Sequence, residues 1–417
     1  MPDGRTLCES ECRMTAHPPP RKAGERMGAP EAASRPDSRT DRLVTLFTAG
    51  DPLADAVVAE LDHYGPPARR ALDAGLRNGL ASLDAKPPAA VAALLRHLET
   101  PPPWVDPLML HRGDLTSLSV APMWFQLCSV TVALAHTYAS PATARQLVAE
   151  GRPADLAARR LTEAGVWARQ TVRPGGLLRG RPGYLATVEV RLHHARMRAR
   201  AVEEWDLGAT GLPIGRLDMA RTWLGFTFEA FRALEALGIG TGPDEERHLY
   251  RYWAYVAHLL GLGESLHQDV HDHAGAHRLR DLMEHVTPAP DENTRVLITA
   301  LVDAQSRATA GAPGADLSEE QVRHLLHSVL RRAFGPQWGD RVGIPEVPSA
   351  TDLLPLISRL NREARYWQTY SPASAQEARR RALAGPGPDP TAAVEPCGSA
   401  CRRIAEGARP AVLAGAA

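Results

Sequence analysis

The sequence has no excess charge of either sign and almost no lysine. Basic and acidic residues number 48 each, so the formal net charge of the 417-residue chain at pH 7 is zero. This balance argues against a protein that binds nucleic acid through a positive overall field. The chain has two lysines, Lys22 and Lys86, and the rest of the 48 basic residues are arginines. A site that needs a lysine side chain therefore has almost no candidates.

Cysteine is also scarce, with five in the chain. Cys128 lies in an apolar run, whereas Cys8 and Cys12, and Cys397 and Cys401, form CxxxC pairs near the two ends. So few cysteines in a chain of this length exclude a scaffold held by disulfides. A zinc site formed by the two terminal pairs is an alternative interpretation of these residues.

Long apolar runs are missing as well. The longest, 120–135 ("VAPMWFQLCSVTVALA"), is short for a membrane span and contains Gln126 and Ser129, so it predicts a buried core helix. Residues 1–40 carry six prolines and no apolar segment of the kind found in secretion signals. We therefore expect a soluble cytoplasmic protein with no integral membrane span. Residues 1–40 and the tail 385–417, which begins "GPGPDPTAA", are predicted to be disordered.

Helical periodicity dominates the rest of the chain, and the apolar–polar alternation typical of strands is absent. We therefore predict an all-α fold with a single large helical domain over 41–384. Prolines and glycines separate the expected helices. These are predicted at 51–65, 67–83, 88–99, 120–138, 141–149, 153–171, 183–205, 215–237, 244–261, 264–286, 292–309, 318–333 and 350–368.

Two adjacent histidines lie in the segment "VEVRLHHARMR" of one predicted helix. At 100° per residue, His193 shares a stripe with charged residues, which predicts a solvated face. His194 shares its stripe with Val190 and Met197, so we expect it to point into the core. A histidine among apolar side chains is either a hydrogen-bonded core residue or a ligand.

Arg160 is a second unusual residue, because its predicted helical stripe is otherwise small and apolar and includes Ala164 and Trp167. A buried guanidinium must be paired. Arg160 is therefore either half of an interhelical ion pair or a clamp for an anionic ligand. A buried histidine and a buried arginine on neighbouring helices would suit haem. The histidine would bind the iron, and the arginine would pair with a propionate or polarise bound oxygen.

A competing set of possible metal ligands lies further along the chain. Glu245-x-x-His248 and Glu264-x-x-His267 are two Glu-x-x-His pairs on consecutive predicted helices, a spacing found in ferritin-like di-iron sites. His271 follows His267 by one helical turn, which is a possible zinc-binding face. Against both interpretations, the first pair lies in a polar first turn, and the histidine-rich segment looks like a solvated surface.

Several motifs in one order resemble the latex-clearing-protein (rubber oxygenase) family. Its wider relatives include an oxygenase that shortens a prenyl side chain. The resemblance spans roughly residues 45–370 and rests on six segments. These are "GDPLADAVVAEL" (50–61), "PPPWVD" (101–106), "RRLTEAG" (159–165), "VRLHHARMR" (190–198), "GLPIGRLDMARTWLGFTFEAF" (211–231) and "YRYWAYVAHLLGL" (250–262).

The resemblance implies a mostly helical fold with a globin-like core around haem b. It implies that His194, in "RLHHA", is the axial ligand of the iron and that Arg160 is the family's essential arginine. Asp218 and Thr222 match a further family motif and either support the pocket or pack between helices. Ala164, one turn after Arg160, is expected to leave space on the same helix face.

The chain departs from the family's pattern at several positions. Glu163 and Ala164 stand where the rubber-oxygenase branch carries lysine and threonine. The branch's proposed catalytic glutamate maps near Ala144, and Glu150 and Glu163 are the nearest substitutes. These differences, together with the lack of an export signal, argue against polymeric rubber as the substrate.

We therefore predict a haem b-dependent oxygenase that acts with O₂ on an apolar, unsaturated small molecule such as a prenylated compound. His194 would hold the iron, Arg160 and Glu163 would be catalytic, and Ala164 and Thr222 would line the cofactor pocket. One alternative is a non-haem di-iron or mononuclear metalloenzyme that uses the Glu-x-x-His pairs. Another is a non-catalytic helical protein that binds haem or lipid.

Overall fold

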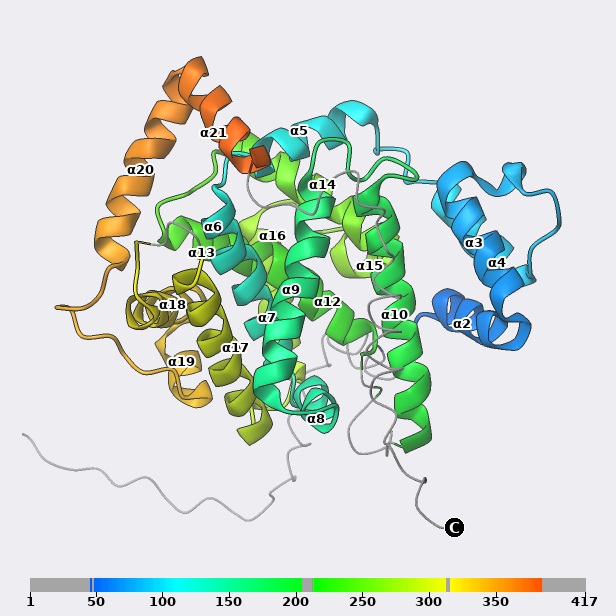
Figure 1. Cartoon of the computed structure of the whole chain (residues 1–417), viewed down its shortest axis with the longest axis horizontal. Coiled ribbons are helices and arrows are strands. Elements are labelled where there is room, and N and C mark those ends of the chain that lie inside the picture. The colour runs from blue at the N-terminus through cyan, green and yellow to red at the C-terminus, as the bar shows by residue number, and fades with distance from the viewer. Residues whose placement is uncertain (1–45, 47–48, 205–211, 213, 313–315, 385–417) are drawn as a thin grey trace, which may run out of the picture. The chain divides into compact units, whose positions relative to one another are not determined.

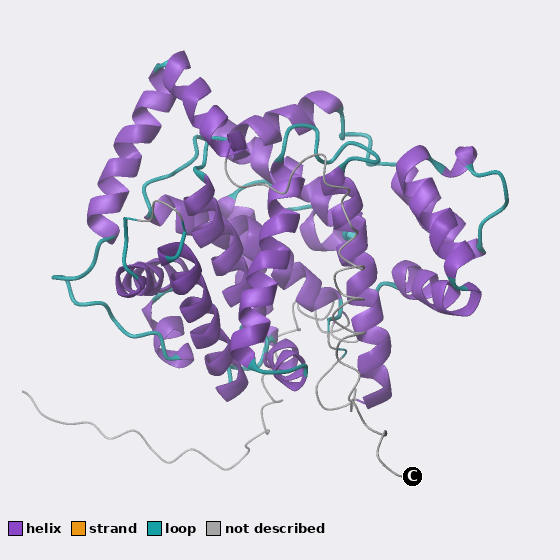
Figure 2. Cartoon of the chain, in the orientation of Figure 1, coloured by secondary structure: helices purple, strands orange, loops and turns teal. Residues whose placement is uncertain are grey.

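The computed structural model describes residues 46, 49–204, 212, 214–312 and 316–384, and within these ranges all regular structure is helical (Figure 2). The predicted all-α class is therefore confirmed. Every described residue belongs to one compact unit, 38–417. The segments 1–40 and 385–417, including both cysteine pairs, lie outside the described residues.

Figure 1 labels the α-helices among the elements of this fold, which follow here in chain order. They are α2 (Pro52–Tyr64), α3 (Pro66–Asn78), η1 (Leu80–Ser82), α4 (Ala89–Glu99), α5 (Pro107–Ser117), α6 (Pro122–Trp124), η2 (Phe125–Thr131), α7 (Val132–Tyr138), α8 (Pro141–Ala149), α9 (Pro153–Val172), α10 (Pro182–Glu204), α12 (Arg216–Leu224), η3 (Gly225–Glu229), α13 (Ala230–Ala236), α14 (Pro243–Leu259), α15 (Glu264–His267), α16 (His273–Val286), α17 (Glu292–Ala310), α18 (Glu319–Phe334), α19 (Pro336–Val342), α20 (Leu354–Tyr370) and α21 (Pro372–Ala384).

Helices α9 and α10 pack side by side, and α17 packs against α9. The link between α9 and α10 is a close turn that requires glycine. A Cβ atom on Gly176 would lie 2.3 Å from the backbone oxygen of Gln170, and one on Gly183 would lie 2.4 Å from the same oxygen. No side chain can be added at such distances without moving the backbone. The turn thus fixes how the two helices approach each other.

Buried ion pairs join α10 to the N-terminal helices α2 and α3 (blue in Figure 1). Arg191 donates to both carboxylate oxygens of Asp51 at 2.6 and 3.0 Å. Arg198 donates to Asp55 at 2.7 Å. Such pairs orient helices strongly, because the loss of one partner leaves a buried charge uncompensated.

The boundaries differ from the predicted ones where proline or a polar cap starts a helix. Helices α5, α19 and α21 were not predicted, and each begins with a proline, which favours the first helical position even though it interrupts a helix elsewhere. The single helix predicted at 264–286 is two helices. The second begins after Asp272, whose side chain accepts a hydrogen bond from the Gly275 amide at 2.7 Å.

The two long helices predicted at 120–138 and 215–237 each contain a π-helical turn, η2 and η3. These turns pack against each other next to α7. Wider turns of this kind are frequent at functional sites, because they redirect side chains without ending the helix.

No single helix among the described residues is long and apolar enough to cross a membrane. One pair of segments, 107–117 and 122–138, meets the length and composition criteria together, but the two are bent by 98° relative to each other. The second segment, predicted to be a core helix, is indeed mostly buried.

Candidate functional site

A cavity of about 360 Å³ lies between α9, α10 and α12, and side chains from α3, α7, α8 and η3 also line it. This volume falls within the range of about 300–1,000 Å³ that is usual for small-molecule sites. The elements that meet here are far apart in the sequence. The glycine turn between α9 and α10 and the ion pairs of α10 help to hold these distant elements in place around the cavity.

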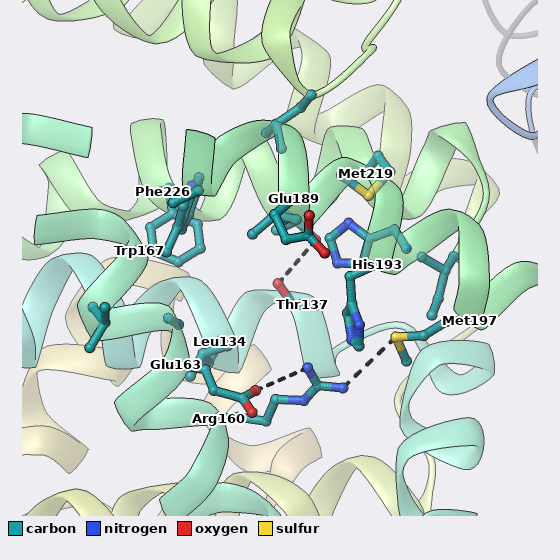
Figure 3. A pocket seen from close by; sticks show the side chains of 18 of the residues that line it. Leu134, Thr137, Arg160, Glu163, Trp167, Glu189, His193, Met197, Met219 and Phe226 are labelled. Atoms are coloured by element: carbon teal, nitrogen blue, oxygen red, sulfur yellow. Dashed lines mark hydrogen bonds and ion pairs between the residues drawn. The ribbon is translucent and has the colours of Figure 1, made fainter. Parts of the chain in front are cut away.

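The wall of the cavity is largely apolar. Trp167 and Phe226 stand together on one side, with ring centroids 4.8 Å apart in an edge-to-face arrangement (Figure 3). The indole nitrogen of Trp167 donates to Thr187 Oγ1 at 3.1 Å, which holds the ring in place. Met197 and Met219 line the wall as well (Figure 3). Such a surface favours an apolar, planar or flexible ligand.

His194 lines this cavity from α10. Its Nδ1 atom is buried and has no hydrogen-bond partner. Burial, with smaller contributions from His193, Arg198 and Arg160, lowers the pKa of His194 well below its usual value. The ring is therefore neutral at physiological pH, which is the state in which imidazole binds a metal.

His193 also lines the cavity, and the predicted solvated position for it is wrong. Its Nε2 atom is buried without a partner, and burial lowers its pKa to about 4. The N-terminal part of the charged stripe that suggested solvent is packed, although Arg200 at its end is exposed. Glu189 on that stripe is 4 % exposed and accepts hydrogen bonds from Arg69 at 2.8 Å and from Arg196 at 3.1 Å.

Arg160 lies on the cavity wall between Glu163 and Met197 (Figure 3). Its Nη1 atom is 3.4 Å from Glu163 Oε2, and its Nη2 atom is 3.7 Å from Glu150 Oε2 and 3.9 Å from the Met197 sulfur. Glu150 and Glu163, the nearest substitutes for the catalytic glutamate proposed for the rubber-oxygenase branch, thus contact the same guanidinium. Glu163 lines the cavity, and the exposed Glu150 is absent from its lining.

Ala164 and Thr222 line the cavity, as does Asp218. The Thr222 hydroxyl donates to the backbone oxygen of Asp218 at 3.0 Å and accepts from Thr137 at 3.4 Å. Ser140 donates to the Asp218 carboxylate at 2.9 Å, while burial raises the pKa of that carboxyl group. Thr137, Asp218 and Thr222 are thus polar groups in a largely apolar wall, and Ser140 supports Asp218 without lining the cavity.

Some lining residues carry no local signal in the sequence. Arg69 and Leu76 come from α3, more than 80 residues before Arg160, and Phe226 comes from the π-helical turn η3. Tyr138 contributes a buried hydroxyl without a hydrogen-bond partner, and burial raises the pKa of that hydroxyl. Only the fold brings such positions to one cavity.

The Glu-x-x-His residues do not form a metal centre. Glu245 accepts hydrogen bonds from the Gly242 amide at 3.0 Å and from Arg365 at 2.7 Å, so it caps α14 and holds α20. Glu264 and His271 are exposed. Within the described ranges, no group of three or more His, Cys, Asp or Glu side chains is arranged to hold a metal ion. The di-iron and zinc interpretations therefore lack their ligand sets.

Comparison with known proteins gives one family match and one related structure. The family model described as "ER-bound oxygenase mpaB/B'/Rubber oxygenase, catalytic domain" matches residues 116–354. A solved structure of the latex clearing protein LCP in the closed state is similar, with a TM-score of 0.58 and 19% sequence identity. The similarity covers 81% of this chain and 91% of that one. No curated protein matches the sequence.

Proposed function

Because this chain belongs to the oxygenase family that includes the ER-bound mpaB/B' enzymes and the rubber oxygenases, we propose that it is a haem b-dependent oxygenase. Its substrates would be O₂ and an apolar, unsaturated small molecule with an isoprenoid-like chain. The observation that carries this proposal is the apolar cavity with a neutral, unpartnered histidine on its wall.

The residues of the cavity fit a haem. His194 is held neutral by burial, so one ring nitrogen can bind iron without first losing a proton. The apolar walls around Trp167, Phe226 and Met219 suit a porphyrin, and Arg160 supplies a cation for a carboxylate group. A bound haem would supply the chemistry of O₂ activation, which is a property of the cofactor.

The chain's own residues would then position the substrate and exclude water. The apolar wall favours an isoprenoid chain over a polar compound. Thr222, with Thr137 and Asp218 behind it, offers hydroxyl groups to a polar part of the substrate. Ala164 leaves room on the α9 face between Arg160 and Trp167.

We assign the role of acid or base to Glu163. Glu189, another carboxylate of the cavity wall, is fixed by two arginines. Glu163 is also near two arginines, but these contacts are longer, at 3.4 Å to Arg160 and 4.0 Å to Arg159, so this carboxylate is held less tightly and is the better placed of the two to act on a bound ligand. Arg160 would keep Glu163 oriented toward the cavity.

The visible spectrum of the purified protein, with metal analysis, tests the cofactor assignment. We expect a Soret band and one iron per chain. His194→Ala should abolish haem retention, whereas the matched change His193→Ala, on the same cavity wall, should retain it, because the resemblance in "RLHHA" assigns the iron to His194. Equal haem loss in both variants, or in neither, would refute the assignment. A Soret band without substrate-dependent O₂ consumption would favour a binding protein over an oxygenase.

A further inference from the structure

Helix α20 (Leu354–Tyr370) directs two polar side chains, Asn361 and Arg365, toward the protein. The Asn361 side chain donates to the backbone oxygen of Leu237 at 2.8 Å. Arg365 donates to both carboxylate oxygens of Glu245 at 2.7 and 3.0 Å. Leu354 and Ile357 also pack against the core, so polar and apolar contacts together fix this helix to the rest of the described chain.

The opposite face of α20 carries large apolar side chains in solvent. Leu356, Leu360 and Trp367 are 56%, 57% and 53% exposed. Their spacing of four and seven residues places them on one stripe, about half a turn of the helix away from Asn361 and Arg365. A surface helix normally exposes few large apolar side chains, so a second, exposed apolar stripe is unusual.

An aromatic cluster adjoins the stripe. The ring centroids of Tyr366 and Trp367 lie 5.5 Å apart, and those of Tyr366 and Tyr370 lie 4.7 Å apart. Tyr370 is 70% exposed. An exposed patch of leucine and aromatic side chains, here interrupted by the exposed Glu363, is typical of a binding surface. Tryptophan and tyrosine in particular favour the boundary between water and lipid.

The same segment is positively charged, although the whole chain is neutral. Residues 354–384 contain six arginines and two glutamates, an excess of four positive charges. One of the six, Arg365, faces the protein and pairs with Glu245. The exposed arginines are Arg359 and Arg362 on α20 and Arg380 and Arg381 on α21 (Pro372–Ala384).

This charge distinguishes between possible partners. A second copy of the chain, packed stripe to stripe, would bring two positively charged segments together. An anionic bilayer instead attracts exposed arginines and accepts the apolar stripe at its interface. The matched family domain ends at residue 354, where α20 begins, so this surface lies outside that domain.

We propose that α20 and α21 dock this protein on an anionic lipid bilayer. The stripe of Leu356, Leu360 and Trp367 inserts among the lipid headgroups, and the arginines face the lipid phosphates. The docking is a property of the protein surface and needs neither cofactor nor turnover. It therefore stands or falls independently of the proposed oxygenase activity.

Flotation of the full-length protein with vesicles tests this proposal. The vesicles contain 30% phosphatidylglycerol in phosphatidylcholine, with pure phosphatidylcholine as the neutral comparison. The stripe variant is Leu356→Gln/Leu360→Gln/Trp367→Gln. The matched control is Tyr64→Gln/Leu108→Gln, because these side chains are 54% and 56% exposed on α2 and α5. Light scattering after gel filtration gives the oligomeric state of each protein.

We expect binding to the anionic vesicles that weakens at 0.5 M salt and with the neutral vesicles. The stripe variant should bind more than tenfold less tightly, since each large apolar side chain leaving water contributes about tenfold. The control should bind like wild type, and all proteins should have the same mass. The proposal is overturned if wild type does not bind anionic vesicles, or if the stripe variant binds as well as wild type. If wild type is a dimer and the stripe variant is a monomer, the partner is a second copy of the chain. This result would also overturn the proposal.

Discussion

The carboxyl group of Glu229 predicts how the stability of this protein depends on pH. Glu229 ends the π-helical turn η3, is fully buried, and has no hydrogen-bond partner for either oxygen. Arg280 Nη1 lies 3.7 Å away. Burial raises the pKa of Glu229 from 4.5 to about 7, against the opposing effect of Arg280 and Arg232 and with a smaller contribution from Glu284.

The free energy follows from the two pKa values. In the unfolded chain Glu229 loses its proton near pH 4.5, whereas in the folded protein it keeps it to about pH 7. The unfolded state therefore binds fewer protons between these values, so Glu229 lowers the free energy of unfolding as the pH rises. Between pH 5 and pH 8 this loss amounts to about 2–3 kcal/mol.

Glu229→Gln removes this titration while keeping the size of the side chain. Its free energy of unfolding relative to wild type should rise by about 2–3 kcal/mol from pH 5 to pH 8. Any fixed cost of burying the amide cancels in this difference. Urea titrations at four pH values measure it, and Glu292→Gln, which removes a carboxylate that is 76% exposed, is the control. A difference that does not change with pH would mean that Glu229 is ionised in the fold and paired with Arg280.

Two further predictions concern the cavity. Arg160→Leu should leave the free energy of unfolding of the cofactor-free protein within about 1 kcal/mol of wild type, because its partners Glu150 and Glu163 reach solvent. The haem affinity of Arg160→Leu should fall, and that of Arg160→Lys should lie between the affinities of wild type and Arg160→Leu. A haem titration in which Arg160→Leu binds as tightly as wild type would exclude Arg160 from the site. Glu163 stands where the rubber-oxygenase branch carries lysine, so no lysine amine has to be displaced from the iron of the haem-loaded protein. Imidazole should therefore shift the visible spectrum of its ferric form readily. A spectrum already typical of two nitrogen ligands before imidazole is added would contradict this.

Much of the architecture could be predicted from local patterns. Helical periodicity identified the fold class and most helices, because a 3.6-residue repeat of apolar side chains reflects burial directly. The same reasoning placed His194 on an inward face, and the structure places it on the cavity wall. Helices α5 and α19 were missed, although proline also begins helices that were predicted, such as α2 and α9.

The rest depended on contacts between distant segments. The stripe of His193 looked solvated because it contains charged residues. Glu189 on this stripe is nevertheless buried, because Arg69 of α3 and Arg196 pair with it. The sequence pattern of α10 does not indicate that Glu189 pairs with Arg69, which lies 120 residues earlier. In the same way, the spacing of Glu245 could not distinguish a metal ligand from a residue that caps one helix and holds another.

The ion pairs of α10 bear on where the folding unit of this protein begins. The family match starts at residue 116, which leaves Asp51, Asp55 and Arg69 outside the matched segment. Their partners Arg191, Arg198 and Glu189 lie within it and are each at most 4% exposed. A fragment cut at residue 116 would leave two cations and an anion in the interior without these partners, on the helix that carries His194. The catalytic segment defined by family likeness is thus smaller than the segment that can fold autonomously, and α2 and α3 belong to the minimal unit.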